Sequence, residues 1–106
     1  MLRTMKLTAM TLGMMCAAQA MAAADLTVIS FGGANKTAQE KAFYAPWEKA
    51  GNGKIIAGEY NGEMAKVKTM VDTKSVSWDL VEVESPELAR GCSEDMFEEI
   101  DPAILG

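Results

Sequence analysis

The side chains of this sequence that could do chemistry are few and mostly acidic. There is no histidine, and the two cysteines, Cys16 and Cys92, lie far apart in the chain. The common zinc sites and the Ser-His or Cys-His catalytic pairs therefore cannot be assembled from these residues. Neither a G-x-G-x-x-G dinucleotide pattern nor a phosphate-binding loop with its lysine is present. The residue types thus predict no metal site and no cofactor.

Glu82 and Glu84 are the carboxylates whose spacing suits acid–base chemistry. Side chains two residues apart on a regular strand point to the same face, so both groups could act on one substrate. A solvated strand edge, or a contact with a neighbouring lobe, explains the same pair without any reaction. The sequence therefore predicts a protein that is not an enzyme, and it keeps an exported enzyme fragment as the alternative.

Two turn sequences carry the remaining groups of interest. An apolar, β-branched run from Leu26 to Phe31 ends in Gly32-Gly33, and an acidic turn that includes a hydroxyl begins at Glu84. Glycine permits a sharp turn and a close approach of a ligand to backbone amides. Taken singly, each sequence is more often an ordinary turn or helix start. Only a shared position in the fold would make them parts of one site.

Strand patterns surround both turns. We expect strands over residues 26–31, 54–60 and 80–84, where β-branched and apolar residues gather between glycine, proline and asparagine. The last of these shows the alternation typical of a half-buried strand. Each predicted strand is followed by a sequence with a different period, which indicates a helix.

Three helices are expected. Apolar residues at spacings of three and four predict an amphipathic helix over 35–50, and Pro46 should bend or divide it near Ala45. Asn61 is the predicted N-cap of the second helix. Gly91 is the predicted C-cap of a short third helix.

The order of these elements predicts an α/β fold with a mainly parallel sheet flanked by helices. Such sheets bind ligands at the carboxyl ends of their strands, where loops and helix starts converge. Phe31 and Glu84 both come at or just after predicted strand ends. We therefore expect these two side chains to lie beside one another and to form half of a cleft.

The charge of the chain restricts its partners. The formal net charge is −5, whereas nucleic-acid binders need clustered positive charge to displace counterions from phosphate. A nucleic-acid partner is therefore not expected, and a cationic ligand suits the chain better. A plain alternative is that acidic balance keeps an exported protein in solution.

Residues 1–24 have the features of a cleaved secretory signal. Arg3 and Lys6 precede a short apolar stretch, and small residues follow it before Asp25. The stretch is shorter than the roughly 20 residues that a membrane-spanning helix needs. We therefore expect export to the periplasm and a mature chain of residues 25–106, in which Cys92 is the only cysteine.

The mature chain resembles the periplasmic substrate-binding proteins of ABC transporters, in the branch that binds putrescine or spermidine. The resemblance covers nearly all of residues 25–106, and its most specific segments are SFGGA, YNGEMAKVKTMV and WDLVEVESPEL. It implies a type II periplasmic binding protein fold, in which two α/β lobes close on the ligand like a hinged clamp. Complete members are much longer, so residues 25–106 are expected to be a truncated, N-terminal part of the first lobe. The partner of Cys92 would then lie further along a longer chain.

The resemblance also assigns ligand-binding positions. The residues that match the ligand-facing segments of the family are Ser30, Phe31, Gly32, Gly33, Glu84 and Ser85. Phe31 would lie against an alkyl chain or a cation, with plain core packing as an equal alternative, and Glu84 would pair with an ammonium group. The best-known polyamine binders carry a tryptophan at the first turn, where this sequence has Gly32-Gly33. Another small cationic solute is therefore also expected.

Together these features predict the solute-binding component of an ABC importer, which delivers a polyamine-like small molecule to an inner-membrane permease without chemistry of its own. Two alternatives stay open. One is the exported enzyme fragment that uses carboxylates as acid and base. The other is an inactive truncated product, because three strands with an open edge bury little apolar surface.

Overall fold

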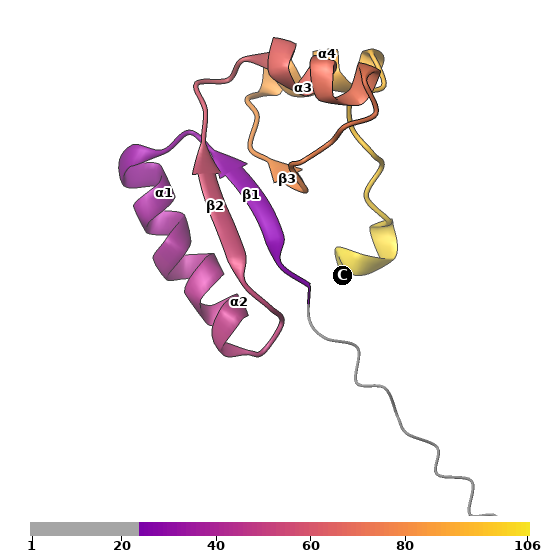
Figure 1. The fold of residues 1–106 in the computed structure, drawn as a ribbon. Helices are drawn as coiled ribbons and strands as arrows, with labels where there is room; N and C mark the ends of the chain where they lie inside the picture. Colours follow the sequence, from indigo (N-terminus) through magenta and orange to yellow (C-terminus); the bar gives the residue numbers. More distant parts are fainter. Residues whose placement is uncertain (1–23) are drawn as a thin grey trace, which may run out of the picture.

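A three-stranded parallel sheet organises the computed structural model, which describes residues 24–106 (Figure 1). The strands are β1 (Leu26–Ser30), β2 (Ile55–Glu59) and β3 (Leu80–Val81). They lie in the order β2-β1-β3, with Leu26 beside Ile55 and Val28 beside Leu80. The predicted α/β fold with a mainly parallel sheet is confirmed. The predicted signal peptide lies outside the described residues, apart from Ala24.

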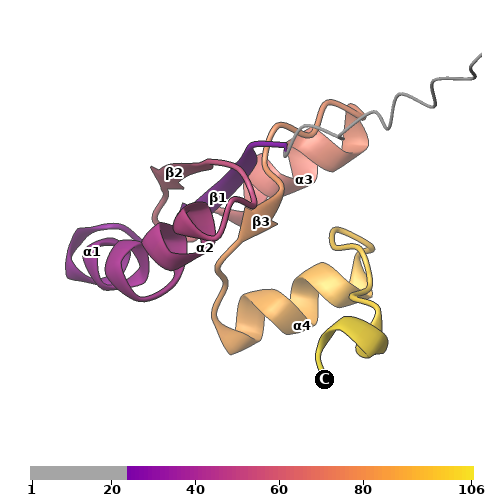
Figure 2. The ribbon, with the colours of Figure 1, turned by 90° about the horizontal axis from the view of Figure 1, so that it is seen from below.

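Helices lie on both sides of the sheet. The helical elements are α1 (Gly33–Gln39), the π-helical turn η1 (Glu40–Tyr44), α2 (Ala45–Lys49), α3 (Met64–Asp72), α4 (Ser85–Ser93) and the 3-10 turn η2 (Pro102–Ile104). Figure 2 shows α1 and α3 on opposite sides of the strands, with α4 beyond β3. Within residues 24–106, no helix combines the length and apolar character needed to cross a membrane.

The first helix changes its hydrogen-bonding pattern just before Pro46. Proline has no amide hydrogen, and its ring clashes with the carbonyl four residues earlier. A π-helical turn over Glu40–Tyr44 precedes it, and the α-helical pattern resumes at Ala45. The expected division of this helix near Ala45 is confirmed, and a local π-turn is its structural form.

The predicted N-cap of α3 is wrong. Glu63 is the N-cap, and its carboxylate accepts hydrogen bonds from the backbone N–H and the side-chain amide of Asn61, at 3.0 and 3.3 Å. Gly62 between them has a φ of 88°, a conformation that glycine adopts without a steric penalty. Asn61 therefore helps to close the turn before α3 and does not cap the helix.

The predicted C-cap at Gly91 is also wrong. α4 continues to Ser93, and Gly91 is buried within it against the ring of Phe97. The backbone N–H of Met96 donates to the carbonyl of Gly91 at 2.8 Å, so the chain folds back over the helix. Glycine is needed at this position for close packing and not for a left-handed turn.

β3 ends at Val81, before the predicted end of this strand at Glu84. The backbone N–H of Glu82 still donates to the carbonyl of Ile29 at 2.8 Å. The Glu82 side chain turns to α1, and Val83 packs against the buried cluster, so the chain leaves the sheet here. Glu82 and Glu84 are therefore not paired on one pleated strand, as the enzyme alternative required.

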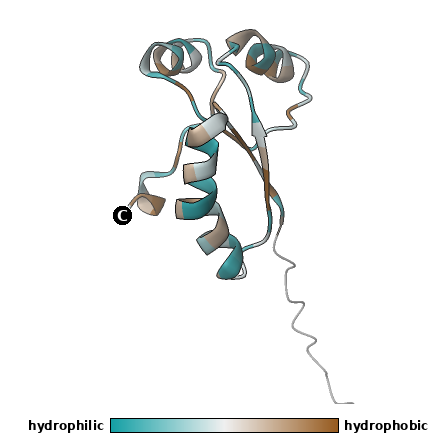
Figure 3. Cartoon of the chain, turned by 90° about the vertical axis from the view of Figure 1, so that its left-hand side faces the viewer, coloured by the Kyte–Doolittle hydropathy of each residue, from teal (hydrophilic) through white to brown (hydrophobic). Residues whose placement is uncertain are grey.

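The buried core lies between the sheet and the α3 and α4 side of the molecule. Met64, Val67 and Met96 form a cluster, on which Trp78 and Phe97 pack. Hydropathy colouring shows apolar residues along the strands and mixed residues along the α1–α2 helix (Figure 3). The core is small, since its cluster contains one side chain from the segment after α4 and two from α3.

Replacing Gly91 with alanine should destabilise the chain, although alanine normally favours a helix by about 1 kcal/mol. The added Cβ would overlap the Phe97 ring, and overpacking of this kind costs about 1–3 kcal/mol. We expect Gly91→Ala to lower the free energy of unfolding in urea by about 1–2 kcal/mol. Cys92→Ala, at the exposed neighbouring position, is the control and should change it little. Equal or higher stability of Gly91→Ala would contradict the packing of Phe97 on this helix.

Candidate functional site

A stacked aromatic pair stands at the carboxyl ends of β1 and β2. Phe31 follows β1 directly, Tyr60 follows β2 directly, and their ring centroids are 5.5 Å apart with the planes inclined by 11°. The N–H of Tyr60 donates to the carbonyl of Ser30 at 2.9 Å, which extends the strand pairing to this point. Phe31 is half-buried and Tyr60 is buried, so the pair forms a wall that exposes part of the Phe31 ring.

Trp78 and Lys66 extend this aromatic wall beyond Tyr60. The Trp78 ring meets Tyr60 edge-on, with centroids 5.6 Å apart and an interplanar angle of 74°. The ammonium nitrogen of Lys66 lies 5.0 Å from the centre of the Trp78 ring. Edge-on aromatic contacts and cation–π contacts are both favourable arrangements. The orientation of Tyr60 is therefore fixed from two sides, by Phe31 and by Trp78.

Acidic side chains act on the Tyr60 hydroxyl through their charge. Burial raises the pKa of Tyr60 above its usual value of 10.0, and the negative charges that raise it further are those of Glu82, Glu87, Glu63 and Glu84, in decreasing order. Four acidic side chains from three different segments thus act on one phenol. Such a concentration of negative charge beside aromatic rings attracts a cation.

Glu63 differs from the other three carboxylates. Hydrogen bonds from its own N–H and from the N–H of Asn61 lower its pKa below the usual range, and Lys66 acts in the same direction. Hydrogen bonds to a carboxylate favour its charged form. The Glu63 carboxylate is therefore engaged in hydrogen bonds within the turn before α3. The Glu82 carboxylate is engaged in hydrogen bonds with the first helix, so Glu84 and Glu87 are the carboxylates available to a ligand.

Glu87 has an unusual environment for a carboxylate. It lies in the first turn of α4, and its Oε2 atom is shielded from solvent without a hydrogen-bond partner among the described residues. An unpaired buried polar atom costs about 1–3 kcal/mol, and more when the group is charged. A bound donor at this position would remove that cost.

The turn at Gly32-Gly33 has the geometry that the sequence suggests. Gly32 is buried with a φ of 81°, and a Cβ there would overlap the Glu59 side chain. Gly33 begins α1 with a φ of 55°, and a Cβ there would meet nothing within 4 Å. No side chain caps this helix start. The backbone at Gly33 therefore faces open space at the same edge as Phe31.

Ser30 directly precedes Phe31 in the sequence, but its side chain lies on the face of the sheet that the first helix covers. Val28, two residues earlier, lines a hollow with Phe43 and Trp47 of the first helix, and alternate residues of a strand share a face. Ser30 is only 1% exposed, and its Oγ has no hydrogen-bond partner among the described residues. Its hydroxyl is therefore separated from the Phe31 ring by the backbone of β1.

The predicted residues of the second turn lie at the start of α4. Glu84 is the N-cap and is exposed, and Ser85 is the first residue of the helix and is also exposed. The charge of Glu84 is the smallest of the four that raise the pKa of Tyr60, which stacks on Phe31. The structure thus places Phe31, Gly33, Glu84 and Ser85 along the carboxyl edge of the sheet, and it places Ser30 behind it. Their binding of a ligand stays a prediction.

Tyr60, Trp78 and Glu87 are residues of this edge that the sequence reasoning did not include. A position directly after the second predicted strand was a signal that could have identified Tyr60, because the same rule selected Phe31. Trp78 had no comparable signal, since it precedes a strand and reaches Tyr60 only through the loop after α3. Glu87 carries only the weak sequence signal of an acidic residue in the first turn of a helix.

Glu82 forms hydrogen bonds that connect three elements at this edge of the sheet. Its Oε2 accepts hydrogen bonds from the side-chain amides of Asn35 and Gln39, each at 2.9 Å, and its backbone carbonyl accepts one from the hydroxyl of Tyr60. Tyr44 in turn donates to Gln39 at 3.0 Å. One residue therefore links the end of β3 with the first helix and with the end of β2.

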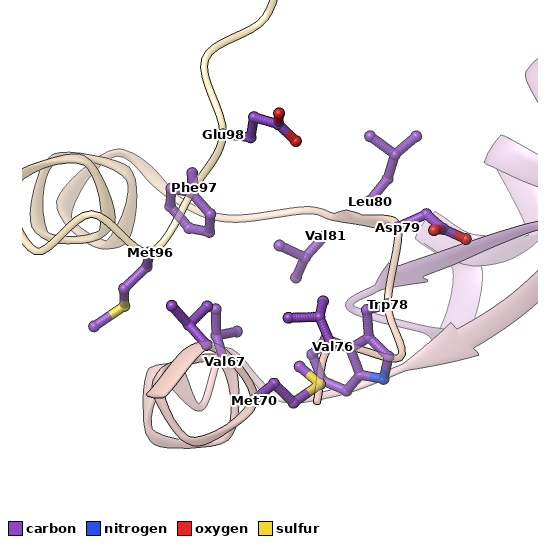
Figure 4. A pocket seen from close by; sticks show the side chains of 11 residues that line it. Val67, Met70, Val76, Trp78, Asp79, Leu80, Val81, Met96, Phe97 and Glu98 are labelled. Carbon is purple, nitrogen blue, oxygen red and sulfur yellow. The ribbon is translucent and has the colours of Figure 1, made fainter. Parts of the chain in front are cut away.

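Two apolar hollows lie elsewhere, on either side of β3. One has a volume of about 450 Å³ and the other about 430 Å³, and Leu80, Val81 and Phe97 line both. In Figure 4 the labelled side chains around the first hollow are mostly apolar, with Asp79 and Glu98 at its rim. None of the six predicted site residues lines either hollow. The aromatic and acidic edge is therefore an open surface and not an enclosed cavity.

The described part of the chain contains no group of side chains arranged to hold a metal ion, and no disulfide. Among residues 24–106, no three His, Cys, Asp or Glu side chains are grouped so that they could hold a metal ion. Cys92 is exposed and is not in a disulfide. The groups that the edge offers are an aromatic face, carboxylates and a glycine turn.

Comparison with known proteins reveals a close relative. The chain is 67% identical, over 82 residues, to the γ-aminobutyric acid-binding protein of Pseudomonas aeruginosa, and the match covers 77% of this chain and 23% of that protein. No family model matches the sequence.

Two solved structures resemble the fold of this chain. The periplasmic binding protein AgtB of Agrobacterium tumefaciens R10, in complex with agropinic acid, aligns with a TM-score of 0.72 and 37% identity over 78% of this chain and 26% of its own. The periplasmic binding protein MotA of A. tumefaciens B6, in complex with glucopine, aligns with a TM-score of 0.70 and 28% identity. This match covers 78% of this chain and 25% of that protein. The described residues thus have part of a periplasmic-binding-protein fold, as expected.

The comparisons also correct one expectation. The solutes named for these proteins are γ-aminobutyric acid, agropinic acid and glucopine, so the predicted putrescine and spermidine branch is not supported. The chain spans about a quarter of the length of each of these relatives.

The acidic surroundings predict the alkaline behaviour of both tyrosines. The pKa of Tyr44 is raised by burial, Glu82 and Glu40, and that of Tyr60 is raised as described above. Because the folded chain disfavours tyrosinate, the stability from these groups is fully present below pH 10 and is lost as the pH rises through the folded-state values. Tyrosinate absorbance should therefore appear above pH 10 in the native chain and near pH 10 in denaturant. A native transition at or below that of the denatured chain would contradict the placement of these carboxylates.

Proposed function

We propose that this chain is the N-terminal part of the first lobe of a periplasmic solute-binding protein, which captures a small molecule bearing an amino group. The observation that carries the proposal is the edge formed by Phe31 and Tyr60 with Glu84 and Glu87 beside them. The identity with the γ-aminobutyric acid-binding protein and the fold shared with two binding proteins support it.

The proposed contacts divide the ligand into two ends. An ammonium group lies over the exposed part of the Phe31 ring and between the carboxylates of Glu84 and Glu87, where it meets the unpaired Oε2 of Glu87. A carboxylate at the other end faces the backbone at Gly33, where the start of the helix carries no side-chain cap. An ω-amino acid such as γ-aminobutyric acid has both groups, whereas a polyamine has only the first.

The remaining parts of the proposed function follow from this class. The protein would work in the periplasm and deliver its ligand to an ABC permease of the inner membrane, after export directed by residues 1–24. It would carry out no reaction. The position of Glu82 supports this, because its carboxylate accepts two amide hydrogen bonds from the first helix and is thereby engaged in structure.

Titration of the ¹⁵N-labelled full chain with γ-aminobutyric acid, followed by NMR, tests the proposal. NMR detects weak binding, which is what an open edge with one set of contacts should give. We expect amide shifts at Gly33, Glu84 and Glu87, and a weaker response to putrescine. Stronger binding of putrescine would restore the polyamine assignment, and the absence of a response to either amine would overturn the proposed ligand class.

Substitution of the carboxylates should weaken this binding. Glu84→Gln should raise the dissociation constant for γ-aminobutyric acid about twofold to fivefold, as expected for an exposed ion pair. Glu87→Gln should have a larger effect, because the Oε2 atom that it alters is shielded from solvent. Glu99→Gln is the matched control, since it removes one exposed carboxylate that does not act on Tyr60. An equal effect of all three variants would show only a response to net charge.

A further inference from the structure

Glu82 makes more connections between separate elements than its place after a two-residue strand suggests. Its N–H donates to Ile29 in β1, its carboxylate accepts from Asn35 and Gln39 in α1, and its carbonyl accepts from Tyr60. Backbone and side chain thus face different partners. Glu82 is therefore held by hydrogen bonds to three separate parts of the chain: β1, α1 and the residue that follows β2.

The contact with Tyr60 connects Glu82 to the aromatic wall. The Tyr60 hydroxyl is held by the Glu82 carbonyl, and its ring stacks on Phe31 at 5.5 Å. Glu82 comes two residues before Glu84, so the same residue also sets where the start of α4 lies. Both halves of the proposed site, the aromatic face and the carboxylates, therefore depend on where Glu82 is placed.

The first helix determines that placement. Asn35 and Gln39 are one helical turn apart, so both amides reach a single carboxylate oxygen. Gln39 also accepts a hydrogen bond from Tyr44, which lies in the π-helical turn. Hydrogen bonds to a charged acceptor are stronger than those between neutral groups. The helix that begins at the Gly32-Gly33 turn is thereby tied to the opposite side of the site.

We infer that Glu82 is a positioning residue of the proposed ligand site, which holds Tyr60 against Phe31 and fixes the start of α4 without touching the ligand. This inference rests on the proposed function for its ligand readout, but its structural content can be measured without any ligand. The signal for that measurement comes from Tyr60 and Tyr44, the two tyrosines of the sequence.

The first test separates the charge of Glu82 from its hydrogen bonds. Glu82→Gln removes the charge and keeps an oxygen that can accept from Asn35 and Gln39. The tyrosinate transitions of both tyrosines should then move down toward pH 10, because Glu82 is the largest charged contributor to both raised values. Neither transition should fall all the way to pH 10, because other carboxylates still act on each tyrosine. These are Glu87, Glu63 and Glu84 for Tyr60, and Glu40 for Tyr44. Near-ultraviolet circular dichroism should stay close to that of the unchanged chain, and the dissociation constant for γ-aminobutyric acid should rise less than in the hydrogen-bond variant of the second test.

The second test removes one of the two side-chain hydrogen bonds to the Glu82 carboxylate, the one from Gln39, and keeps the charge and the bond from Asn35. Gln39→Met has a similar length, favours a helix and lies on the first helix, so the chain should remain folded. It should weaken the near-ultraviolet circular dichroism of the aromatic wall and raise the dissociation constant for γ-aminobutyric acid about tenfold. Lys41→Met, at an exposed position of the same helix, is the matched control and should change neither signal.

The outcomes distinguish the inference from the proposed function. If γ-aminobutyric acid does not bind the unchanged chain, the proposed ligand fails, and the aromatic and tyrosinate signals still decide whether Glu82 positions Tyr60. If Gln39→Met leaves both the aromatic signal and the affinity unchanged, the positioning role is overturned. If Glu82→Gln lowers the affinity as much as Gln39→Met while the aromatic signal is preserved, Glu82 acts on the ligand by its charge, and the inference is likewise overturned.

Discussion

Parallel pairing of β1 with both of its neighbours is the constraint on which the rest of this structure depends. Because the three strands run in one direction, the segments that follow them emerge at one edge of the sheet. Phe31, Tyr60 and the start of α4 meet there although they are far apart in the chain. Parallel strands require long crossover connections, and the helices that form those connections cover the two faces of the sheet. The fold therefore creates an aromatic and acidic edge before any ligand is considered.

The edge combines a rigid part with an open part. Tyr60 is fixed by stacking on Phe31, by an edge-on contact with Trp78 and by its hydrogen bond to Glu82. Glu84 is exposed, and Gly33 faces open space. A rigid aromatic face reduces the entropy lost on binding, while exposed polar groups at its margin can turn toward a ligand. This division suits a surface that holds one side of a small solute.

The distribution of apolar surface fits the same interpretation. The buried cluster is small, and Leu80, Leu88 and Ile100 remain about half exposed beside β3. Leu80 lines both hollows beside β3, Leu88 and Ile100 line one of them, and none of the six predicted site residues lines either. Hollow volume alone would therefore select a different surface from the proposed edge, because an open edge encloses little space. The chemistry of the lining residues is the better guide here.

The sequence alone determined the order of strands and helices, the division of the first helix by Pro46, and the two turns that reach the carboxyl edge of the sheet. These features depend on local properties: hydrophobic period, the missing N–H of proline and the conformational freedom of glycine. It did not determine that Glu82 belongs to a hydrogen-bonded link, that Gly91 lies inside a helix, or that Ser30 faces away from Phe31. It also suggested a polyamine, which the similar proteins do not support. Only the tertiary structure decided the places of Glu82 and Gly91, because each depends on which distant residue occupies the neighbouring space: Asn35 and Gln39 for Glu82, and Phe97 for Gly91.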